Sequence, residues 1–247
     1  MDFQQVAEWL RESHRAVVFT GAGISTESGI PDFRSPGGVW ARNKPVYYDE
    51  FLASEQSRQE YWRQKSEAHV DFAGSVPNAG HRVLASWEQN GTLQGVITQN
   101  IDGLHQDAGS RRVLEIHGTA RFVDCLSCAH RYEVEQMVER FQATGIPPTC
   151  DYCGGITKHA TISFGQQLQP QVIDEATRLS RSADVMLAIG SSLVVEPAAS
   201  LPRIAQAAGA RVVILNRDET PLDHLADRVI HKSIGEALQE IDNILGT

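Results

Sequence analysis

Short, continuous runs of apolar residues recur along this chain and constrain its fold more than any other feature. Each run is four to seven residues long and contains β-branched side chains. The runs are residues 16–20, 95–98, 183–189 and 211–215. Runs of this length are typical of strands that are buried on both faces, as in a parallel sheet.

Amphipathic helices are predicted between these runs. Apolar residues repeat at three- and four-residue spacing near the N-terminus and again over residues 78–87, 172–179 and 234–245. Pro197 suits the first turn of a further helix, and Gly209 suits the position after its end. Strands that alternate with helices predict a doubly wound α/β fold around a parallel sheet.

Two insertions interrupt this alternation. Residues 29–76 form a long, polar and partly helical excursion after the first predicted strand. Residues 121–161 carry all four cysteines of the chain around one amphipathic helix. We therefore expect a small module beside the main sheet.

Charge and hydropathy exclude several classes of function. The 247 residues carry a formal net charge of -9, which disfavours nonspecific binding to nucleic acid or to an anionic membrane and suits basic partners such as lysine-bearing peptides. No apolar run approaches the roughly 20 residues that span a bilayer, and the N-terminal segment does not resemble a signal peptide. We expect a cytoplasmic protein.

The cysteines form two C-x-x-C pairs, which are Cys125 with Cys128 and Cys150 with Cys153, and 21 residues separate the pairs. Two such turns brought together supply the four thiolates of a tetrahedral zinc site. All four positions are then filled by protein, so the metal is structural. A redox role for either pair is the alternative interpretation.

Small and polar residues follow three of the predicted strands. Gly21, Gly23, Ser25 and Thr26 come directly after the first strand, where a glycine turn can bring backbone N–H groups close to a phosphate. The third glycine of G-x-G-x-x-G is missing, so a plain tight turn is an equal alternative. Because residues 190–192 and Asn216 follow two later strands, and ligands of open parallel sheets bind at these strand ends, nucleotide binding is predicted.

These motifs together resemble the sirtuin family, of the bacterial type with some class II-like features. The matching segments are GAGIS (21–25), GIPDFRS (29–35), TQNIDGLHQDAG (98–109), HG (117–118), the cysteine pairs, GSSL (190–193) and Asn216. The resemblance implies a Rossmann-type NAD-binding domain from residues 1–28, 77–120 and 162–247. It also implies a cofactor-binding loop and helical insertion at 29–76 and a small zinc-binding module at 121–161.

The resemblance implies an NAD-dependent protein-lysine deacylase that uses NAD as cosubstrate and zinc as a structural metal. Deacetylation ranks first, and the products would be nicotinamide, O-acyl-ADP-ribose and free lysine. His117 would act as general base, since an imidazole can accept a proton from a ribose hydroxyl at neutral pH. Asn100 and Asp102 would hold the nicotinamide carboxamide and the ribose, although an Asx-turn or a helix cap is the common use of such residues.

The first insertion resembles the mobile cofactor-binding loop of the family. Phe33 would cover the reactive face of the ribose and exclude water, and Arg34 would pair with phosphate. The alternative is a surface loop whose path the flanking prolines set. The full set that the resemblance assigns to NAD is Gly21, Ala22, Gly23, Ser25, Thr26, Asp32, Phe33, Arg34, Gln99, Asn100, Ile101, Asp102, Gly190, Ser191, Ser192, Asn216 and Ile234.

The substrate-binding residues of the family match this sequence less completely than the NAD-binding residues do. Phe164, Gly165 and Val194 match segments that pair with the acyl-lysine peptide in the family, but Lys158-His159 replaces the usual basic residue followed by proline, and Gln166 replaces a glutamate. These changes concern peptide preference more than the core reaction, because backbone pairing tolerates side-chain changes. Tyr61 and Arg63 resemble, with Arg63 one position early, a pair that selects acidic acyl groups. A solvated helix surface is the favoured alternative for Arg63.

Two rival enzymes would use the same cleft, a mono-ADP-ribosyltransferase and an NAD hydrolase. An intact His117 disfavours the first, and the cysteine quartet disfavours the second. A noncatalytic NAD sensor is a third alternative, which the presence of Asn100, Asp102 and His117 disfavours. We expect a monomer that acts on acyl-lysine proteins or peptides and binds neither nucleic acid nor membrane.

Overall fold

The main body of the protein is a six-stranded parallel sheet. The computed structural model describes residues 2–72 and 74–246. The strands are β1 (Ala16–Thr20), β2 (Leu93–Thr98), β3 (Val113–Glu115), β7 (Val185–Ile189), β8 (Arg211–Leu215) and β9 (Arg228–Ile230), in the spatial order β3-β2-β1-β7-β8-β9. Numbered along the chain within this sheet, that is the order 3-2-1-4-5-6 of dinucleotide-binding folds. The predicted doubly wound α/β fold is confirmed.

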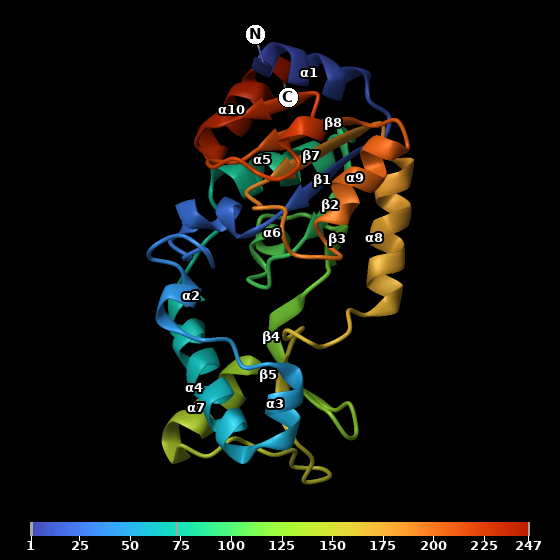
Figure 1. Ribbon diagram of the computed structural model, residues 1–247. Helices are drawn as coiled ribbons and strands as arrows, with labels where there is room; N and C mark the ends of the chain where they lie inside the picture. Colours follow the sequence, from blue (N-terminus) through green and yellow to red (C-terminus); the bar gives the residue numbers. More distant parts are fainter. Residues whose placement is uncertain (1, 73, 247) are drawn as a thin grey trace.

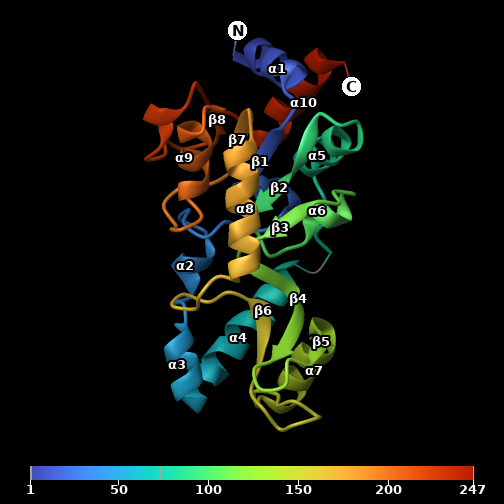
Figure 2. The same cartoon turned by 90° about the vertical axis from the view of Figure 1, so that its right-hand side faces the viewer.

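Helices cover both faces of the sheet (Figures 1 and 2). One face carries α1 (Asp2–Glu12), α5 (Ala79–Gln89) and α10 (Ile234–Leu245), and the other carries α8 (Pro170–Ser182) and α9 (Ser200–Ala207). Strand β1 shows why the runs are continuously apolar, because Val18 packs in the first core and Val17 and Phe19 pack in the second. Every side chain of this strand is therefore buried.

The start of one helix differs from the prediction. Residues 196–199 form hydrogen-bonded turns, and α9 begins only at Ser200 instead of at Pro197. The predicted stop is present, since Gly209 directly follows the last turn with a φ of +98°. Proline at the first helical position does occur in α8, which begins at Pro170.

The two insertions lie at the other end of the molecule (Figure 1). The second holds an antiparallel sheet of β5 (Arg131–Glu133), β4 (Gly118–Cys125) and β6 (Thr157–Thr161), with α7 (Val134–Thr144). The first holds α2 (Val39–Arg42), α3 (Tyr48–Ala53) and α4 (Glu55–Phe72). A third hydrophobic core joins them, because Phe51 and Trp62 of the first insertion pack with Val123 and Met137 of the second. The sequence did not indicate this shared core, and the exact domain boundaries stay a prediction.

Short elements complete the chain. They are the 3₁₀ helices η1 (Ala22–Ser28) and η2 (Asp223–Leu225) and the one-turn helix α6 (Leu104–Asp107). Strands β1 and β7 are neighbours in the sheet although β2 and β3 come between them in sequence, so the strand order reverses there. Open α/β sheets bind ligands at such a reversal. Among the described residues no helix has both the length and the apolar character needed to cross a bilayer.

Candidate active site

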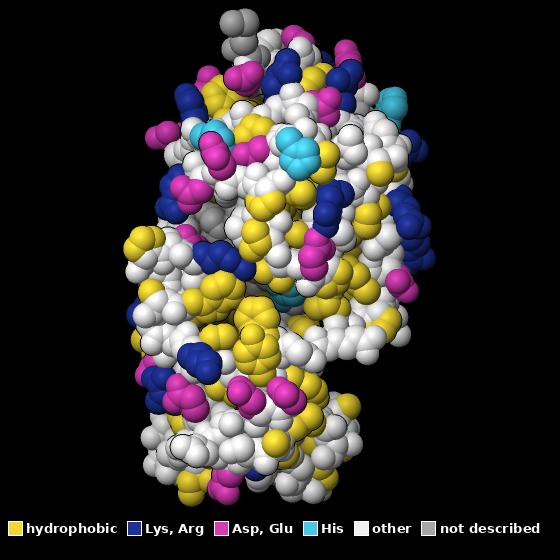
Figure 3. Space-filling view, in the orientation of Figure 1, with side chains coloured by type: hydrophobic (Ala, Val, Ile, Leu, Met, Phe, Trp, Pro, Cys, Tyr) yellow, Lys and Arg dark blue, Asp and Glu magenta, His cyan; other side chains and the backbone are white. Residues whose placement is uncertain are grey.

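A large cavity, of about 1240 Å³, lies where the sheet meets the small module. Its wall combines the loops after β1, β2, β7 and β8 with the first insertion and the segment after β6. Figure 3 shows hydrophobic side chains gathered at the hollow between the two parts of the molecule. Among the predicted site residues, those on the wall are Gly21, Ala22, Gly23, Thr26, Asp32, Phe33, Arg34, Tyr61, Gln99, Asn100, Ile101, His117, Phe164, Gly165, Gly190, Ser191, Ser192, Asn216 and Ile234.

The glycines after β1 have a packing role that the sequence did not indicate, and the role of this loop in phosphate binding stays a prediction. The N–H groups of Gly21 and Gly23 donate to the carbonyl oxygens of Ile189 and Gly190, so they do not point at a phosphate. A Cβ on Gly23 would lie 2.7 Å from the Cα of Gly190, which itself has a φ of +63°. The glycines allow the loops after β1 and β7 to pack directly on one another at the strand reversal.

Ser25 and Asp102 lie behind the cavity wall instead of on it. The Ser25 hydroxyl donates to Oδ2 of Asp102 at 2.7 Å and accepts from Nδ2 of Asn100 at 3.1 Å. Oδ1 of Asp102 accepts the N–H of Leu104 at 2.9 Å, which is the Asx-type cap named above as the alternative. Burial raises the pKa of this carboxyl. Asp102 thus holds Ser25, and Ser25 holds Asn100, which is 6% exposed and does line the cavity.

His117 is presented to the cavity in a defined tautomer. Its Nδ1 lies 3.2 Å from the carbonyl oxygen of Gln99, which can only accept, so Nδ1 carries the hydrogen. The other nitrogen, Nε2, then keeps its lone pair. Burial lowers the pKa of the imidazole, and the bond to Gln99 opposes that shift. A neutral ring with a free lone pair is the state that a general base needs.

The glycine after this histidine is required by the backbone. Gly118 has a φ of +72°, and a Cβ there would lie 2.1 Å from the carbonyl oxygen of Ala160. We expect Gly118→Ala to lower the free energy of unfolding by about 2 kcal/mol or more, because a left-handed residue is strained and the contact is with backbone. Turnover should fall as well, since β4 and His117 must shift. Urea unfolding and steady-state assays check this, with the open position Gly145→Ala as control.

Gly145 also has a positive φ, of +65°, but nothing lies within 4 Å of its Cβ position. The difference between the two variants therefore isolates the backbone clash. Equal losses of stability at both positions would contradict the explanation.

The loop of Asp32, Phe33 and Arg34 is folded over part of the cavity. Oδ1 of Asp32 accepts the N–H groups of Arg34 and Ser35, and the ring of Phe33 lies 5.8 Å from that of Trp40. The Arg34 guanidinium stacks 4.3 Å from the Trp40 ring, and partial burial lowers its pKa. Trp40 was not predicted from the sequence, because an isolated aromatic residue in a polar loop gives no signal of its own.

The predicted substrate residues separate into two groups. Phe164, Gly165 and Tyr61 lie on the cavity wall, whereas Val194 and Arg63 do not. Val194 is 49% exposed, and its neighbour Val195 lines the cavity instead. Arg63 pairs with Glu60 and Glu67 on α4 and donates to Oδ1 of Asn43, which lines the cavity. These contacts favour the solvated helix surface, and a role of Arg63 in substrate binding stays a prediction.

The cavity has a polar inner end beside Tyr61. The hydroxyls of Tyr61 and Thr161 are buried without a hydrogen-bond partner among the described residues, and both residues line the cavity with Lys65. The Lys65 ammonium lies 5.6 Å from the centre of the Tyr61 ring, and burial lowers its pKa to about 8. Thr161 and Lys65 were not predicted as site residues, because their place depends on how α4 packs against β6.

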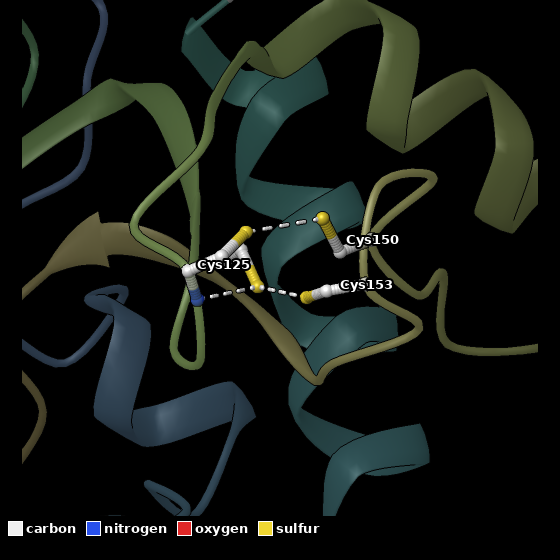
Figure 4. A group of neighbouring side chains, drawn as sticks. Cys125, Cys150 and Cys153 are labelled. Carbon is white, nitrogen blue, oxygen red and sulfur yellow. Dashed lines mark hydrogen bonds between the residues drawn. The ribbon is translucent and has the colours of Figure 1, made fainter.

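The four cysteines come together in the small module. Figure 4 shows the sulfur atoms of Cys125, Cys150 and Cys153 turned toward one another from two loops. The Sγ atoms of Cys125 and Cys153 are 3.5 Å apart, those of Cys128 and Cys150 are 3.6 Å apart, and all four lie within 4.8 Å of one another. Thiolates bound to one zinc at about 2.3 Å would be roughly 3.8 Å apart, and a disulfide would need about 2.05 Å. The quartet fits a zinc ion.

Two buried histidines lie beneath the loop of Asn100. His81 and His105 are 0% and 1% exposed, and burial lowers their pKa values to about 4 and about 3. An unfolded chain protonates them near pH 6.5 and so binds more protons below that pH. We expect the free energy of unfolding to fall as the pH drops from 6.5 toward 4, by up to about 1.4 kcal/mol per pH unit for each ring. Urea unfolding of the wild type and of His105→Gln at several pH values measures how much His105 contributes to this pH dependence. Identical slopes of unfolding free energy against pH in the two proteins would contradict the prediction.

The comparisons with known proteins agree with this geometry. A family model described as the Sir2 family matches residues 21–197, which is more than half of the chain. The chain belongs to the Sir2 family. Curated relatives include the "NAD-dependent protein deacetylase 1" of Bradyrhizobium diazoefficiens, 47% identical over 95% of this chain and 93% of its own. The "NAD-dependent protein deacetylase" of Rhodopseudomonas palustris is 46% identical over 95% of this chain and 94% of its own.

Solved Sir2 structures share the whole architecture. A Sir2 complex with a p53 peptide and NAD+ superposes with a TM-score of 0.92 at 37% identity, covering 100% of this chain and 99% of that one. A Sir2 complex with a deacetylated p53 peptide and 3′-O-acetyl-ADP-ribose gives 0.93 at 36% identity, covering 98% of each chain. The resemblance to the sirtuins that the motifs indicated is confirmed, and so is the Rossmann-type sheet with a cysteine module.

Proposed function

We propose that this Sir2-family protein is an NAD-dependent protein-lysine deacylase whose preferred substrate is acetyl-lysine. The observation that carries the proposal is the joint presence of Asn100 and His117 on the wall of one cavity at the strand reversal of a dinucleotide-binding sheet. Relatives that share almost the whole chain are named for this activity. The products would be nicotinamide, O-acyl-ADP-ribose and the free lysine.

The reaction places different demands on the two residues. Nicotinamide leaves NAD as a neutral molecule from a cationic precursor, so its departure needs no general acid. Asn100, held by Ser25 and by its own backbone bond to Thr98, would orient the carboxamide. The acyl oxygen of the lysine forms the new bond to C1′ of the ribose as the bond to nicotinamide breaks.

His117 would act after this exchange. Its Nε2 lone pair would accept a proton from a ribose hydroxyl, whose oxygen then attacks the acyl carbon. The bond between that carbon and the lysine nitrogen breaks, and the lysine leaves as the amine with the proton that His117 had accepted. Water then adds to the acyl carbon, and the bond from this carbon to the C1′ oxygen breaks, which leaves the acyl group on the ribose hydroxyl oxygen. Burial, which lowers the pKa of His117, keeps the ring neutral and able to accept the proton. Phe33 would exclude water from the ribose before transfer, since its ring lies on the cavity wall.

Zinc would hold the small module that carries the far wall of the cavity. Cys125 ends β4, and Cys150 and Cys153 precede β6, which leads directly to Phe164 and Gly165. Peptide substrates would pair with the backbone of this segment and of the stretch at Val194 and Val195. The metal supplies no chemistry to the reaction, because protein thiolates fill all four positions.

The test is incubation with NAD and a panel of acyl-lysine peptides, followed by mass spectrometry. We expect nicotinamide and O-acyl-ADP-ribose to appear in equal amounts with at least the acetylated peptide. Nicotinamide release without acyl transfer would support an NAD hydrolase instead, and ADP-ribose added to a protein would support a mono-ADP-ribosyltransferase. Either result alone would overturn the deacylase assignment.

Further properties belong to the same proposal. We infer a cytoplasmic monomer whose partners are acyl-lysine proteins and which binds neither nucleic acid nor membrane, and the formal net charge of -9 supports the preference for basic segments. The division into a NAD-binding domain (1–28, 77–120 and 162–247), a cofactor-loop insertion (29–76) and a zinc module (121–161) is supported by the position of the two sheets.

A further inference from the structure

A chain of buried polar groups ends at the backbone of Asn100. Nε2 of His105 lies 2.9 Å from the Thr20 hydroxyl, and that hydroxyl donates to Oγ1 of Thr98 at 2.8 Å. The same Thr98 oxygen accepts the backbone N–H of Asn100 at 3.0 Å. Thr20, Thr98 and His105 are at most 2% exposed and do not line the cavity. They can therefore influence a ligand only indirectly, and Asn100 is the cavity residue at the end of this chain of bonds.

These bonds fix the hydrogen on His105. The Thr20 hydroxyl has one hydrogen, which it donates to Thr98, so toward the imidazole it presents a lone pair. Nε2 of His105 must then carry the ring hydrogen and donate it. Nδ1 is left as an acceptor, and it is buried without a hydrogen-bond partner among the described residues.

His81 packs against His105 and also has a ring nitrogen without a hydrogen-bond partner. Its Nδ1 accepts the backbone N–H of Asn78 at 3.4 Å, so its hydrogen is on Nε2, and this nitrogen is also buried without a partner among the described residues. The rings of His81 and His105 are edge to face, with centroids 4.9 Å apart. These two nitrogens, Nδ1 of His105 and Nε2 of His81, are not hydrogen-bonded to each other, so His81 supports His105 by packing against its ring.

We propose that neutral His105 sets the position of Asn100 through a directional hydrogen-bond relay that passes through Thr20 and Thr98, with the ring of His81 packed against His105. His105 is a positioning residue for the nicotinamide end of the cavity and does not touch the ligand. Thr98 holds the backbone of Asn100, and Ser25 holds its side chain, so the two anchors leave the carboxamide of Asn100 one orientation. Both buried rings stay neutral, which keeps a positive charge away from the cationic nicotinamide of NAD. The inference rests on the proposed function.

The test compares binding of the nicotinamide part of NAD with binding of its ADP-ribose part. His105→Leu removes the donor to Thr20, whereas His105→Gln retains an N–H that can reach it. ADP-ribose lacks nicotinamide, so the dissociation constant for ADP-ribose should change less than about twofold in either variant. In His105→Leu, the inhibition constant of nicotinamide and the KM for NAD should rise about tenfold, the equivalent of one hydrogen bond. His105→Gln should recover most of this loss.

Leu84→Ala is the control for simple destabilisation. Leu84 is fully buried in the same helix as His81 but packs in the apolar core. We expect it to lower the thermal midpoint while the constants for nicotinamide and ADP-ribose keep their ratio. The relay is overturned if His105→Leu leaves nicotinamide inhibition at the wild-type value, or if it weakens ADP-ribose and nicotinamide equally as a general structural defect would.

A second measurement determines the protonation state and tautomer of His81 and His105 in the free protein. Nitrogen-15 NMR of the histidine side chains at pH 7 should find both His81 and His105 neutral with the hydrogen on Nε2. A hydrogen on Nδ1 of His105, or a charged ring, would contradict the relay. Because no ligand is needed, this result decides the relay even if the wild-type protein fails to turn over NAD, a failure that would overturn the proposed function separately.

Discussion

His117→Ala is expected to reduce formation of O-acyl-ADP-ribose by about a hundredfold to ten-thousandfold, the range that a general base contributes. The imidazole lines the cavity with Nε2 left free as an acceptor, and its orientation depends on one bond to the Gln99 carbonyl. Steady-state formation of O-acyl-ADP-ribose from NAD and an acetyl-lysine peptide measures the loss.

His117→Asn separates the chemistry of this residue from its structural role. An asparagine amide can still donate to the Gln99 carbonyl, but it offers no basic nitrogen to a ribose hydroxyl. We expect the same loss of turnover with little loss of stability. His224→Ala, at an exposed position outside the cavity, should keep wild-type activity. Turnover by His117→Asn within tenfold of wild type would show that another group removes the proton.

Cys150→Ser is expected to release the metal and to unfold the small module. Structural zinc binds with an apparent free energy on the order of 10 kcal/mol, and small modules of this kind fold only with the metal. Cys150 is 2% exposed and belongs to the hydrophobic core that joins the two insertions. The far wall of the cavity should then be lost, so activity should fall with the zinc content.

Elemental analysis, thermal unfolding and turnover measure these three effects together. One zinc per chain is expected in the wild-type protein. Tyr152→Ser lies in the same loop but is 74% exposed, and it should keep the metal, the thermal midpoint and the activity. A metal-free preparation that is fully folded and active would contradict a structural zinc site.

The sequence predicts the sheet well because its strands are buried on both faces. Val17, Val18 and Phe19 have no exposed side, so their run is continuously apolar and easy to recognise. Strand β9 gave no such signal, because at the edge of the sheet it is only three residues long and two of these are partly exposed. The start of α9 was also wrong, since Pro197 lies in a turn before the helix.

The site shows a different limit. Short motifs correctly predicted that Asn100 and His117 lie at one cavity. Which residues of a motif face the cavity and which support them from behind depends on three-dimensional contacts. Ser25 and Asp102 belong to the matched segments, yet they lie behind the wall, where Asp102 bonds to Ser25 and Ser25 bonds to Asn100. Lys65 lines the cavity because α4 packs against β6 through Tyr61, Trp62 and His159, and no local pattern encodes that contact.

A crystal structure with an unreactive NAD analogue and an acetyl-lysine peptide tests the central claim most directly. We expect the glycosidic bond to lie between the Asn100 carboxamide and Nε2 of His117, with a ribose hydroxyl within about 3.2 Å of that nitrogen. The acetyl group should enter from the side of Phe164. A dinucleotide bound with its ribose beyond reach of His117, or a peptide bound elsewhere, would contradict the account.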